Sequence, residues 1–173
     1  DTVHIQVDRV SFEGFLTFLN ADMKADLPKY LKAHASDNIT VKTVADVVEY
    51  NEQDTFNRIP YGQSLFEGIV AEDISEEEFL IMKVEYKQKA REALNQPMQE
   101  HNLNAILSIN NSGAGLAAMA QYPCLTIPMG YRDNGRPMGL TFIARQFEED
   151  KLLKMGYAFE QATKARKTPA GYE

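Results

Sequence analysis

The residues of this sequence that best fit a chemical role lie in one short glycine-containing stretch. Gly113, Gly115 and Ala118 spell G-x-G-x-x-A, a permitted form of the dinucleotide-binding fingerprint. In that fingerprint the glycines allow a tight turn, and the N-terminus of the following helix holds a pyrophosphate. The stretch therefore raises the hypothesis of a small-ligand or dinucleotide-binding module that uses the turn of residues 113–118.

The sequence around this turn argues against a dinucleotide site. The helix expected after the turn ends near Gln121, because Tyr122-Pro123 stops it after about two turns. The second strand ends at Met129-Gly130, where the fingerprint requires an acidic residue to hold the ribose. We therefore predict no cofactor, and we interpret the small residues as a means for a short helix to approach its neighbours closely.

Ser112, beside this turn, is a second candidate for chemistry, as a nucleophile. No G-x-S-x-G elbow surrounds Ser112, and no sequence pattern supplies a base for its proton. The single cysteine, Cys124, stands in an apolar strand-like run, so we interpret it as a small buried hydrophobic residue. The three histidines lack the spacing of metal ligands. The sequence therefore predicts no catalytic residue and no metal site.

The charge and composition of the chain exclude two classes of partner. Its 25 acidic and 18 basic residues give a formal net charge of −7, which repels a phosphate backbone, so we expect no nucleic-acid binding. No run of about 18 apolar residues is present, so we expect no membrane span. A lone cysteine leaves no internal disulfide, which fits a reducing compartment and predicts a cytoplasmic location.

Hydrophobic periodicity predicts the elements that must position these residues. After an alternating strand at residues 2–10, residues 1–97 are expected to be mostly helical, with a break or a new start at Pro28. Residues 98–148 read as strands with a short helix and a hairpin, and residues 149–165 as a closing amphipathic helix.

Local signals define several of the expected boundaries. A T-x-x-D pattern at Thr43 and an S-x-x-E pattern at Ser75 are typical of helix starts, and Pro60 is expected to open another helix. Asn134-Gly135 predicts a hairpin between strands at residues 124–131 and 138–145. Neither half of the chain looks self-sufficient. We expect a single unit, residues 1–173, of the α/β class (α+β for a fragment), with a mixed sheet covered by helices.

The run of residues 117–169 resembles the C-terminal end of the amidase signature family. It shares that family's hydrophobic strand with a Pro-x-Gly end, a G-x-P-x-G-L strand and a closing helix. The matching positions are Tyr122, Pro123, Pro128, Gly130, Gly135, Pro137, Gly139, Leu140, Arg145, Phe147, Glu149, Leu152, Leu153 and Glu160. Residues 18–34, 41–53 and 60–69 resemble upstream family segments, in the branch with peptide amidases and cyclic-oligoamide hydrolases.

The resemblance implies an activity whose catalytic groups the sequence lacks. The family hydrolyses amides with a serine nucleophile, a second serine held through a cis peptide, and a lysine base, all within a Gly/Ser-rich N-terminal signature. No such signature and no serine pair occur in this sequence. The resemblance therefore implies the C-terminal portion of an amidase, inactive alone, with a small-molecule amide as substrate of the whole enzyme. A non-catalytic, amidase-like interaction protein remains the alternative.

Two further expectations concern surfaces. Asn110, Asn111, Ser112 and Gly113 follow a strand end, where α/β sheets commonly place ligands, so we predict that they bind substrate; alternatively they only cap the short helix. The strands at 124–131 and 138–145 are apolar on both faces, and they lose neighbours if the rest of a sheet is missing. Because exposed apolar edges tend to self-associate, we expect a homo-oligomer.

Overall fold

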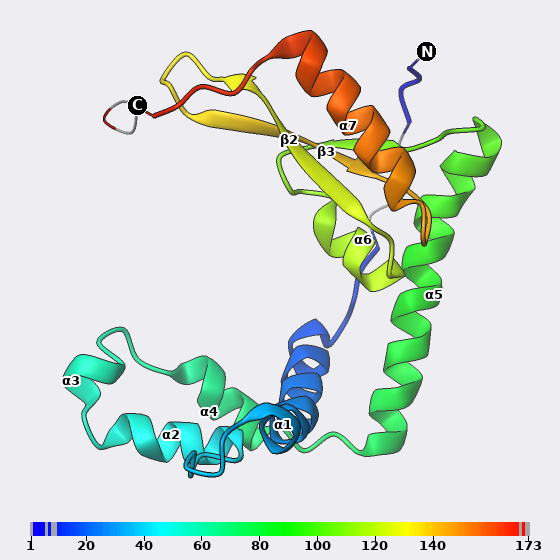
Figure 1. Cartoon of the computed structure of the whole chain (residues 1–173). Coiled ribbons are helices and arrows are strands. Elements are labelled where there is room, and N and C mark those ends of the chain that lie inside the picture. The colour runs from blue at the N-terminus through cyan, green and yellow to red at the C-terminus, as the bar shows by residue number, and fades with distance from the viewer. Residues whose placement is uncertain (1, 6, 8–9, 170, 172–173) are drawn as a thin grey trace. The chain divides into compact units, whose positions relative to one another are not determined.

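The structure, a computed structural model, describes residues 2–5, 7, 10–169 and 171 of the 173 (Figure 1). Two compact units make up the chain: a helical unit, Phe12–Val84, and a sheet unit, Asp1–Ser11 with Glu85–Glu173. The expectation that residues 1–173 act as a single unit stays a prediction. The elements are α1 (Phe15–His34), α2 (Val44–Glu52), α3 (Thr55–Arg58), α4 (Ser64–Ala71), α5 (Glu76–Glu100), β1 (Ile106–Ile109), α6 (Ala114–Ala120), β2 (Cys124–Tyr131), β3 (Pro137–Ile143) and α7 (Glu149–Thr163).

Two capping boxes begin helices of the helical unit where the sequence predicts them. At the start of α2, the Thr43 hydroxyl accepts the Asp46 N–H at 3.2 Å, and the Asp46 carboxylate accepts the Thr43 N–H at 2.8 Å. Ser75 and Glu78 exchange the same pair of bonds at 3.2 Å each before α5. Both boxes satisfy backbone donors that a helix start leaves unpaired, so both boundaries are local properties of the sequence.

The helix boundaries that the sequence predicts at prolines differ from those in the structure. Helix α1 continues through Pro28 and α5 through Pro97, although proline removes one helical hydrogen bond. Pro97 is buried, so packing offsets that loss. Helix α4 begins at Ser64 and not at Pro60, because Gly62 between them has φ +80°, a left-handed conformation that a helix cannot include.

The sheet unit contains a three-stranded sheet in the order β1-β3-β2, with both neighbouring pairs antiparallel. The Asn134-Gly135 hairpin joins β2 to β3 as predicted. Gly135 adopts φ +79°, and the Asn134 side chain accepts the Arg136 N–H at 3.1 Å. The chain is thus a mixed helix and sheet structure, in agreement with the expected class.

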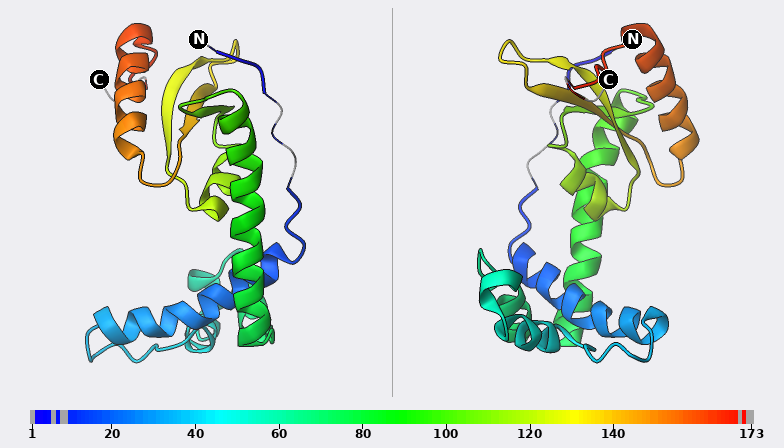
Figure 2. Two further views of the ribbon diagram at one scale, coloured as in Figure 1. Left: turned by 90° about the vertical axis from the view of Figure 1, so that its right-hand side faces the viewer. Right: turned by 60° about the vertical axis from the view of Figure 1, so that its left-hand side comes forward.

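The core of the sheet unit lies between the sheet and α7. Leu152 of α7 packs on Ile127 and Phe142, and the left view of Figure 2 shows α7 on one face of the sheet, opposite α6 and the later part of α5. A Cβ atom at Gly156 would lie 2.5 Å from Ile127 Cδ1 and 2.7 Å from Leu125 Cδ2. Helix α7 therefore approaches β2 as closely as a glycine allows.

Two expectations at the sheet edges are corrected. The strand expected at residues 2–10 is absent from its described residues, and Gln6, Asp8 and Arg9 lie outside them. Alternating apolar and polar residues form a strand only where a neighbouring strand pairs with their backbone N–H and C=O groups. Cys124, expected to be buried, is exposed, because β2 is an edge strand and α7 covers the face on which Leu125 lies. Within the described residues, no helix has the length and apolar character that a membrane span requires.

Candidate functional site

The four residues predicted to bind substrate lie together in the turn between β1 and α6. Asn110 ties this turn to β3: its N–H donates to the Gly139 carbonyl at 2.7 Å, and its side-chain oxygen accepts the Gly139 N–H at 2.9 Å. Its carbonyl also accepts the hydroxyl of Thr141. Asn110 has φ +54°, the left-handed conformation that asparagine tolerates best among residues with a side chain. Asn110 therefore extends the β1–β3 pairing by one residue.

Ser112 and Gly113 also form the turn itself. The Ser112 hydroxyl donates to the Ile109 carbonyl at 2.5 Å, and the Gly113 N–H donates to the Ser108 hydroxyl oxygen at 3.2 Å. A Cβ at Gly113 would lie 2.8 Å from both Ser108 Oγ and Ile143 Cδ1. The side chain of Ser112 does not cap α6, and the proton of its hydroxyl is directed at the Ile109 carbonyl. This geometry gives Ser112 a structural bond and no base.

Asn111 differs from its three neighbours in the turn. Its backbone carbonyl accepts the Ala114 N–H at 3.0 Å, but its side chain is exposed and makes no hydrogen bond within the described part of the chain. An amide group carries two donors and one acceptor, which match the acceptor and donor of an amide substrate. The substrate-binding role of all four residues stays a prediction, and Asn111 is the one whose side chain is available for it.

The glycine turn does not have the surroundings of a dinucleotide site. Helix α6 has seven residues, too short for the long crossover helix of that fold, and both neighbouring strand pairs are antiparallel. Close approach explains Gly113 but not Gly115, since a Cβ at Gly115 would meet nothing within 4 Å. The geometry offers no support for the dinucleotide hypothesis.

Several positions that match the amidase signature family make structural contacts. The Tyr122 hydroxyl donates to Asn95 Oδ1 at 2.8 Å, and the Arg145 guanidinium donates to the Leu103 carbonyl at 3.4 Å. A Cβ at Gly139 would lie 2.7 Å from Thr126 Cγ2. These three positions join α5, the sheet and the loops, and the contacts that they make are structural.

Ionisable groups with shifted pKa values lie at helix starts and in surface ion pairs. The Lys151 side chain, and secondly the Arg145 N–H, hold the pKa of Glu148 below its usual range. The Ser75 hydroxyl and N–H do the same to the pKa of Glu78. Both shifts favour the charged carboxylate, whereas a general acid needs a raised pKa. The described residues contain no cluster of three side chains suited to hold a metal ion.

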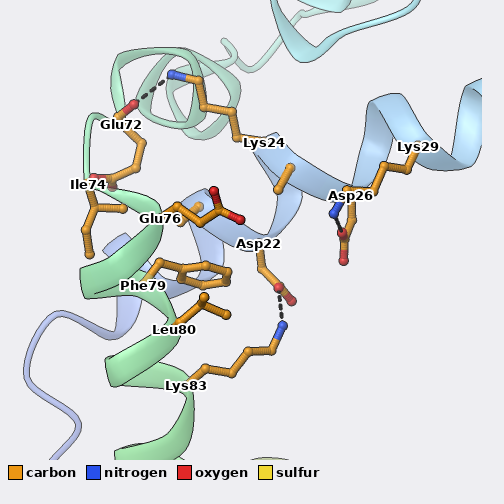
Figure 3. Close-up of a pocket in the computed structure, with 12 residues that line it drawn as sticks. Asp22, Lys24, Asp26, Lys29, Glu72, Ile74, Glu76, Phe79, Leu80 and Lys83 are labelled. Carbon is orange, nitrogen blue, oxygen red and sulfur yellow. Dashed lines mark hydrogen bonds and ion pairs between the residues drawn. The ribbon is translucent and has the colours of Figure 1, made fainter.

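A groove of about 520 Å³ in the helical unit was not predicted from the sequence (Figure 3). Most of its lining is charged, and we call it the charged groove: Asp22, Asp26, Glu72, Glu76, Lys24, Lys29 and Lys83, with apolar residues including Phe79 and Leu80. All three lysines already have partners. Lys83 pairs with Asp22 at 2.8 Å, Lys29 pairs with Asp26 at 2.9 Å, and Lys24 donates to the Val70 and Glu72 carbonyls at 2.8 and 2.7 Å. Four acids against three lysines leave the charged groove with two ion pairs and a formal net charge of −1.

A second groove, of about 850 Å³, lies along β1 in the sheet unit. We call it the uncharged groove, because none of its described lining residues is Asp, Glu, Lys or Arg. Its lining comes from residues 2–5, 101–107 and 109, with Phe142 and Met155. This groove could not be predicted from the sequence, because the residues that line it are far apart in the chain.

Comparison with known proteins relates the chain to amidases. A probable amidase of Arabidopsis thaliana is 32% identical over 157 residues, which are 87% of this chain and 30% of the plant protein. The crystal structure of an amidase family protein from Bacillus anthracis matches 97% of this chain with a TM-score of 0.87 and 33% identity, over 33% of its own length. The native peptide amidase from Stenotrophomonas maltophilia matches 93% of this chain with a TM-score of 0.81 and 28% identity, over 35% of its length.

The extent of these matches is as informative as their similarity. The chain spans about a third of the length of these three proteins. No protein-family model matches the chain.

Proposed function

The chain belongs to the amidase signature family, and on that premise we propose that it is the C-terminal portion of an amide-bond hydrolase, inactive alone. The observation that carries this proposal is a match over nearly the whole chain to one third of an amidase family structure. Under this proposal the whole protein hydrolyses a carbon–nitrogen bond of a small amide, and this chain supplies structure and part of the pocket wall.

The proposal assigns the serine nucleophile, the cis-serine and the lysine base to a part of the enzyme outside this chain. A lysine base must be neutral, which requires burial or a cationic neighbour that lowers its pKa. Lys29 shows the opposite: the hydrogen bond and charge of Asp26 hold the pKa of Lys29 above its usual range. No two serines are adjacent in the sequence. These observations support a chain without catalytic groups of its own.

We assign the turn of residues 110–113 to the wall of the amide pocket. Asn110, Ser112 and Gly113 would act by holding the shape of the turn, through the bonds to Gly139, Ile109 and Ser108. Asn111 would act directly, because its exposed amide can pair with the carbonyl or N–H of a substrate amide.

A chimera tests the proposal. In it, this chain replaces the matched third of the Bacillus anthracis amidase family protein. We expect the isolated chain to hydrolyse simple peptide amides no faster than buffer, and the chimera to hydrolyse them measurably. Hydrolysis by the isolated chain that Ser112→Ala abolishes would contradict the proposal. A folded chimera without activity would favour the alternative, an amidase-like interaction protein.

The same chimera tests the pocket wall. Asn111→Ala should raise KM roughly two- to tenfold with little change in kcat, as expected for the loss of one hydrogen bond to the bound substrate. Asn38→Ala, which changes an exposed asparagine of the helical unit, is the matched control and should change neither constant. Equal effects of the two variants would remove Asn111 from the pocket. A cytoplasmic location and a homo-oligomeric state are further parts of the proposal that the sequence alone supports.

A further inference from the structure

A row of three hydroxyl side chains crosses the sheet, one from each strand. Thr141 of β3 stands opposite Ser108 of β1 and opposite Thr126 of β2. Residues directly opposite each other in neighbouring strands point to the same face of a sheet. Leu140 and Phe142, which flank Thr141, belong to the core beside α7, so Thr141 points to the other face, on the side of α6 (Figure 2). We call these three side chains the hydroxyl row.

The hydroxyl of Thr141 is buried for a reason other than packing. The residue has no exposed surface. A valine has the same branched shape without a polar group, so apolar packing alone gives no reason for a hydroxyl at this position. The bonds that the hydroxyl makes must therefore explain it.

These bonds lead in one direction, to the first residue of the turn before α6. The Thr141 hydroxyl donates its proton to the Asn110 carbonyl. Because a hydroxyl has a single proton, Thr141 must accept in its 2.6 Å contact with the Thr126 hydroxyl, and Thr126 must donate. Hydrogen bonds arranged in such a chain strengthen one another. The donor sequence thus runs from Thr126 through Thr141 to the Asn110 carbonyl.

The position of this carbonyl determines how Asn111 is presented. The Asn110 carbonyl oxygen and the Asn111 N–H belong to one planar peptide group, so a bond that fixes the oxygen also fixes the plane from which Asn111 begins. Asn110 has φ +54°, a conformation that costs energy and that surrounding bonds must hold. At the other end of the turn, Ser108 accepts the Gly113 N–H at 3.2 Å. Asn111 therefore lies between two residues that the hydroxyl row holds.

We propose that Thr141 is a positioning residue of the amide pocket, which acts through the Asn110 carbonyl to set the direction in which Asn111 presents its side-chain amide. Ser108 acts in the same way from the Gly113 end of the turn. This inference rests on the proposed function, because it takes Asn111 to contact the substrate. It goes further by assigning part of the amide recognition to side chains of the sheet that do not contact the substrate themselves.

Kinetics of the chimera test the positioning role. Thr141→Val removes the proton but keeps the branched shape, and it should raise KM roughly two- to tenfold with little change in kcat, as expected of Asn111→Ala. Thr141→Ser keeps the hydroxyl and should stay within about twofold of the unmodified chimera. The matched control is Thr163→Val at the end of α7, where the hydroxyl donates to the Phe159 carbonyl at 2.9 Å. This control should change neither constant.

A double variant separates positioning from general loosening of the fold. If Thr141 acts on the substrate only through Asn111, adding Thr141→Val to Asn111→Ala should change KM by less than about twofold. An undiminished effect of Thr141→Val in the Asn111→Ala background would overturn the inference, since Thr141 would then act through another group. An active chimera in which Thr141→Val raises KM and Asn111→Ala does not would overturn it as well, while leaving amide hydrolysis in place.

Hydrogen exchange, in the isolated chain and in the chimera, tests the turn without relying on activity. The Ala114 N–H donates to the Asn111 carbonyl at 3.0 Å, a bond that requires the turn to be formed. Its exchange should become faster by about threefold or more in Thr141→Val. The Arg132 N–H, bonded to the Arg136 carbonyl at 2.9 Å in the hairpin, should change by less than about twofold. Unchanged exchange at Ala114 in a folded Thr141→Val variant would overturn the inference, even if the chimera hydrolyses amides.

Two further outcomes keep this inference distinct from the proposed function. Faster exchange at Ala114 in a folded chimera without activity would support the positioning of the turn by Thr141 and count against the proposed function. If Thr141→Val does not fold, Ser108→Ala takes its place, because it removes the acceptor of the Gly113 N–H at the other end of the turn. Ser108→Ala should raise KM and speed exchange at Ala114 in the same way, and unchanged values of both would overturn the inference.

Discussion

The two grooves of this protein have opposite compositions. The charged groove is lined by seven charged residues, whose lysines are bonded to neighbouring acids or carbonyls (Figure 3). The uncharged groove has no charged residue in its described lining and leaves Leu107 and Ile109 half exposed. Charged side chains are stably hydrated at a surface, whereas an apolar surface beside a strand edge is stable mainly when covered.

The two units also differ in what stabilises them. In the sheet unit, glycines bring helix and strand into direct contact, as Gly156 does against Ile127 and Leu125. In the helical unit, exposed side chains also cap helices and form ion pairs, as at Ser75 and at Lys83. Close packing tolerates little change, while exposed polar bonds each contribute little. Mutations should therefore separate the units by the size of their effects.

The largest effect is expected at the closest helix–strand contact. Gly156→Ala would place a methyl group 2.5 Å from Ile127 Cδ1, and it should lower the free energy of unfolding by about 1–3 kcal/mol through overpacking. The matched control is Gly115→Ala, which meets nothing within 4 Å in α6 and should be neutral or stabilising by up to about 1 kcal/mol. Denaturant unfolding followed by circular dichroism measures both. A Gly156→Ala variant as stable as Gly115→Ala would show that α7, or the ends of the Ile127 and Leu125 side chains, can move to admit the methyl group.

A smaller effect is expected at a helix start of the helical unit. Ser75→Ala removes the hydroxyl that accepts the Glu78 N–H, which should cost about 1 kcal/mol of local stability. Hydrogen exchange of the first amides of α5 should speed up accordingly. Ser64→Ala, at an exposed helical position where the cap residue Gln63 makes no side-chain capping bond, is the control. Unchanged exchange in Ser75→Ala would mean that packing holds this helix start without its cap.

The same cap should make the helical unit sensitive to acid. The pKa of Glu78 lies below its usual 4.5 because the Ser75 hydroxyl and N–H bind its carboxylate. A carboxyl with a depressed folded-state pKa stabilises the fold above the unfolded pKa, and this contribution is lost as the pH falls through the folded value. Protection of the first α5 amides should therefore decline below about pH 4.5. The decline should be shallower in Glu78→Gln; an identical decline in that variant would assign the effect to other groups.

The smallest effect is expected at an ion pair of the charged groove. Lys83 and Asp22 are 2.8 Å apart, but their side chains are 45% and 38% exposed, so Lys83→Met should cost no more than about 0.5 kcal/mol. The difference from the unmodified chain should shrink further in 1 M salt, which screens exposed charges over about 3 Å. A loss above about 2 kcal/mol would mean that the pair is far less hydrated than its exposure indicates.

What could be read from the sequence was local. The two capping boxes, the Asn134-Gly135 hairpin and the closing helix from Glu149 follow from residues that interact within a few positions of each other. The resemblance to the amidase signature family, which was also read from the order and spacing of residues, is confirmed by the similar proteins. Turn and cap geometry depend on neighbouring side chains, so a sequence contains enough information to predict them.

What the tertiary structure decided depends on residues far apart in the chain. Pro97 stays inside α5 because the unit buries it, and Cys124 is exposed because β2 forms an edge of the sheet. The sequence predicted Asn110 as a ligand-binding residue. Only the fold showed that Asn110 bonds to Gly139, 29 positions away. The uncharged groove joins residues near both ends of the chain for the same reason. Burial and edges are properties of how strands and helices pack, and local propensity does not encode them.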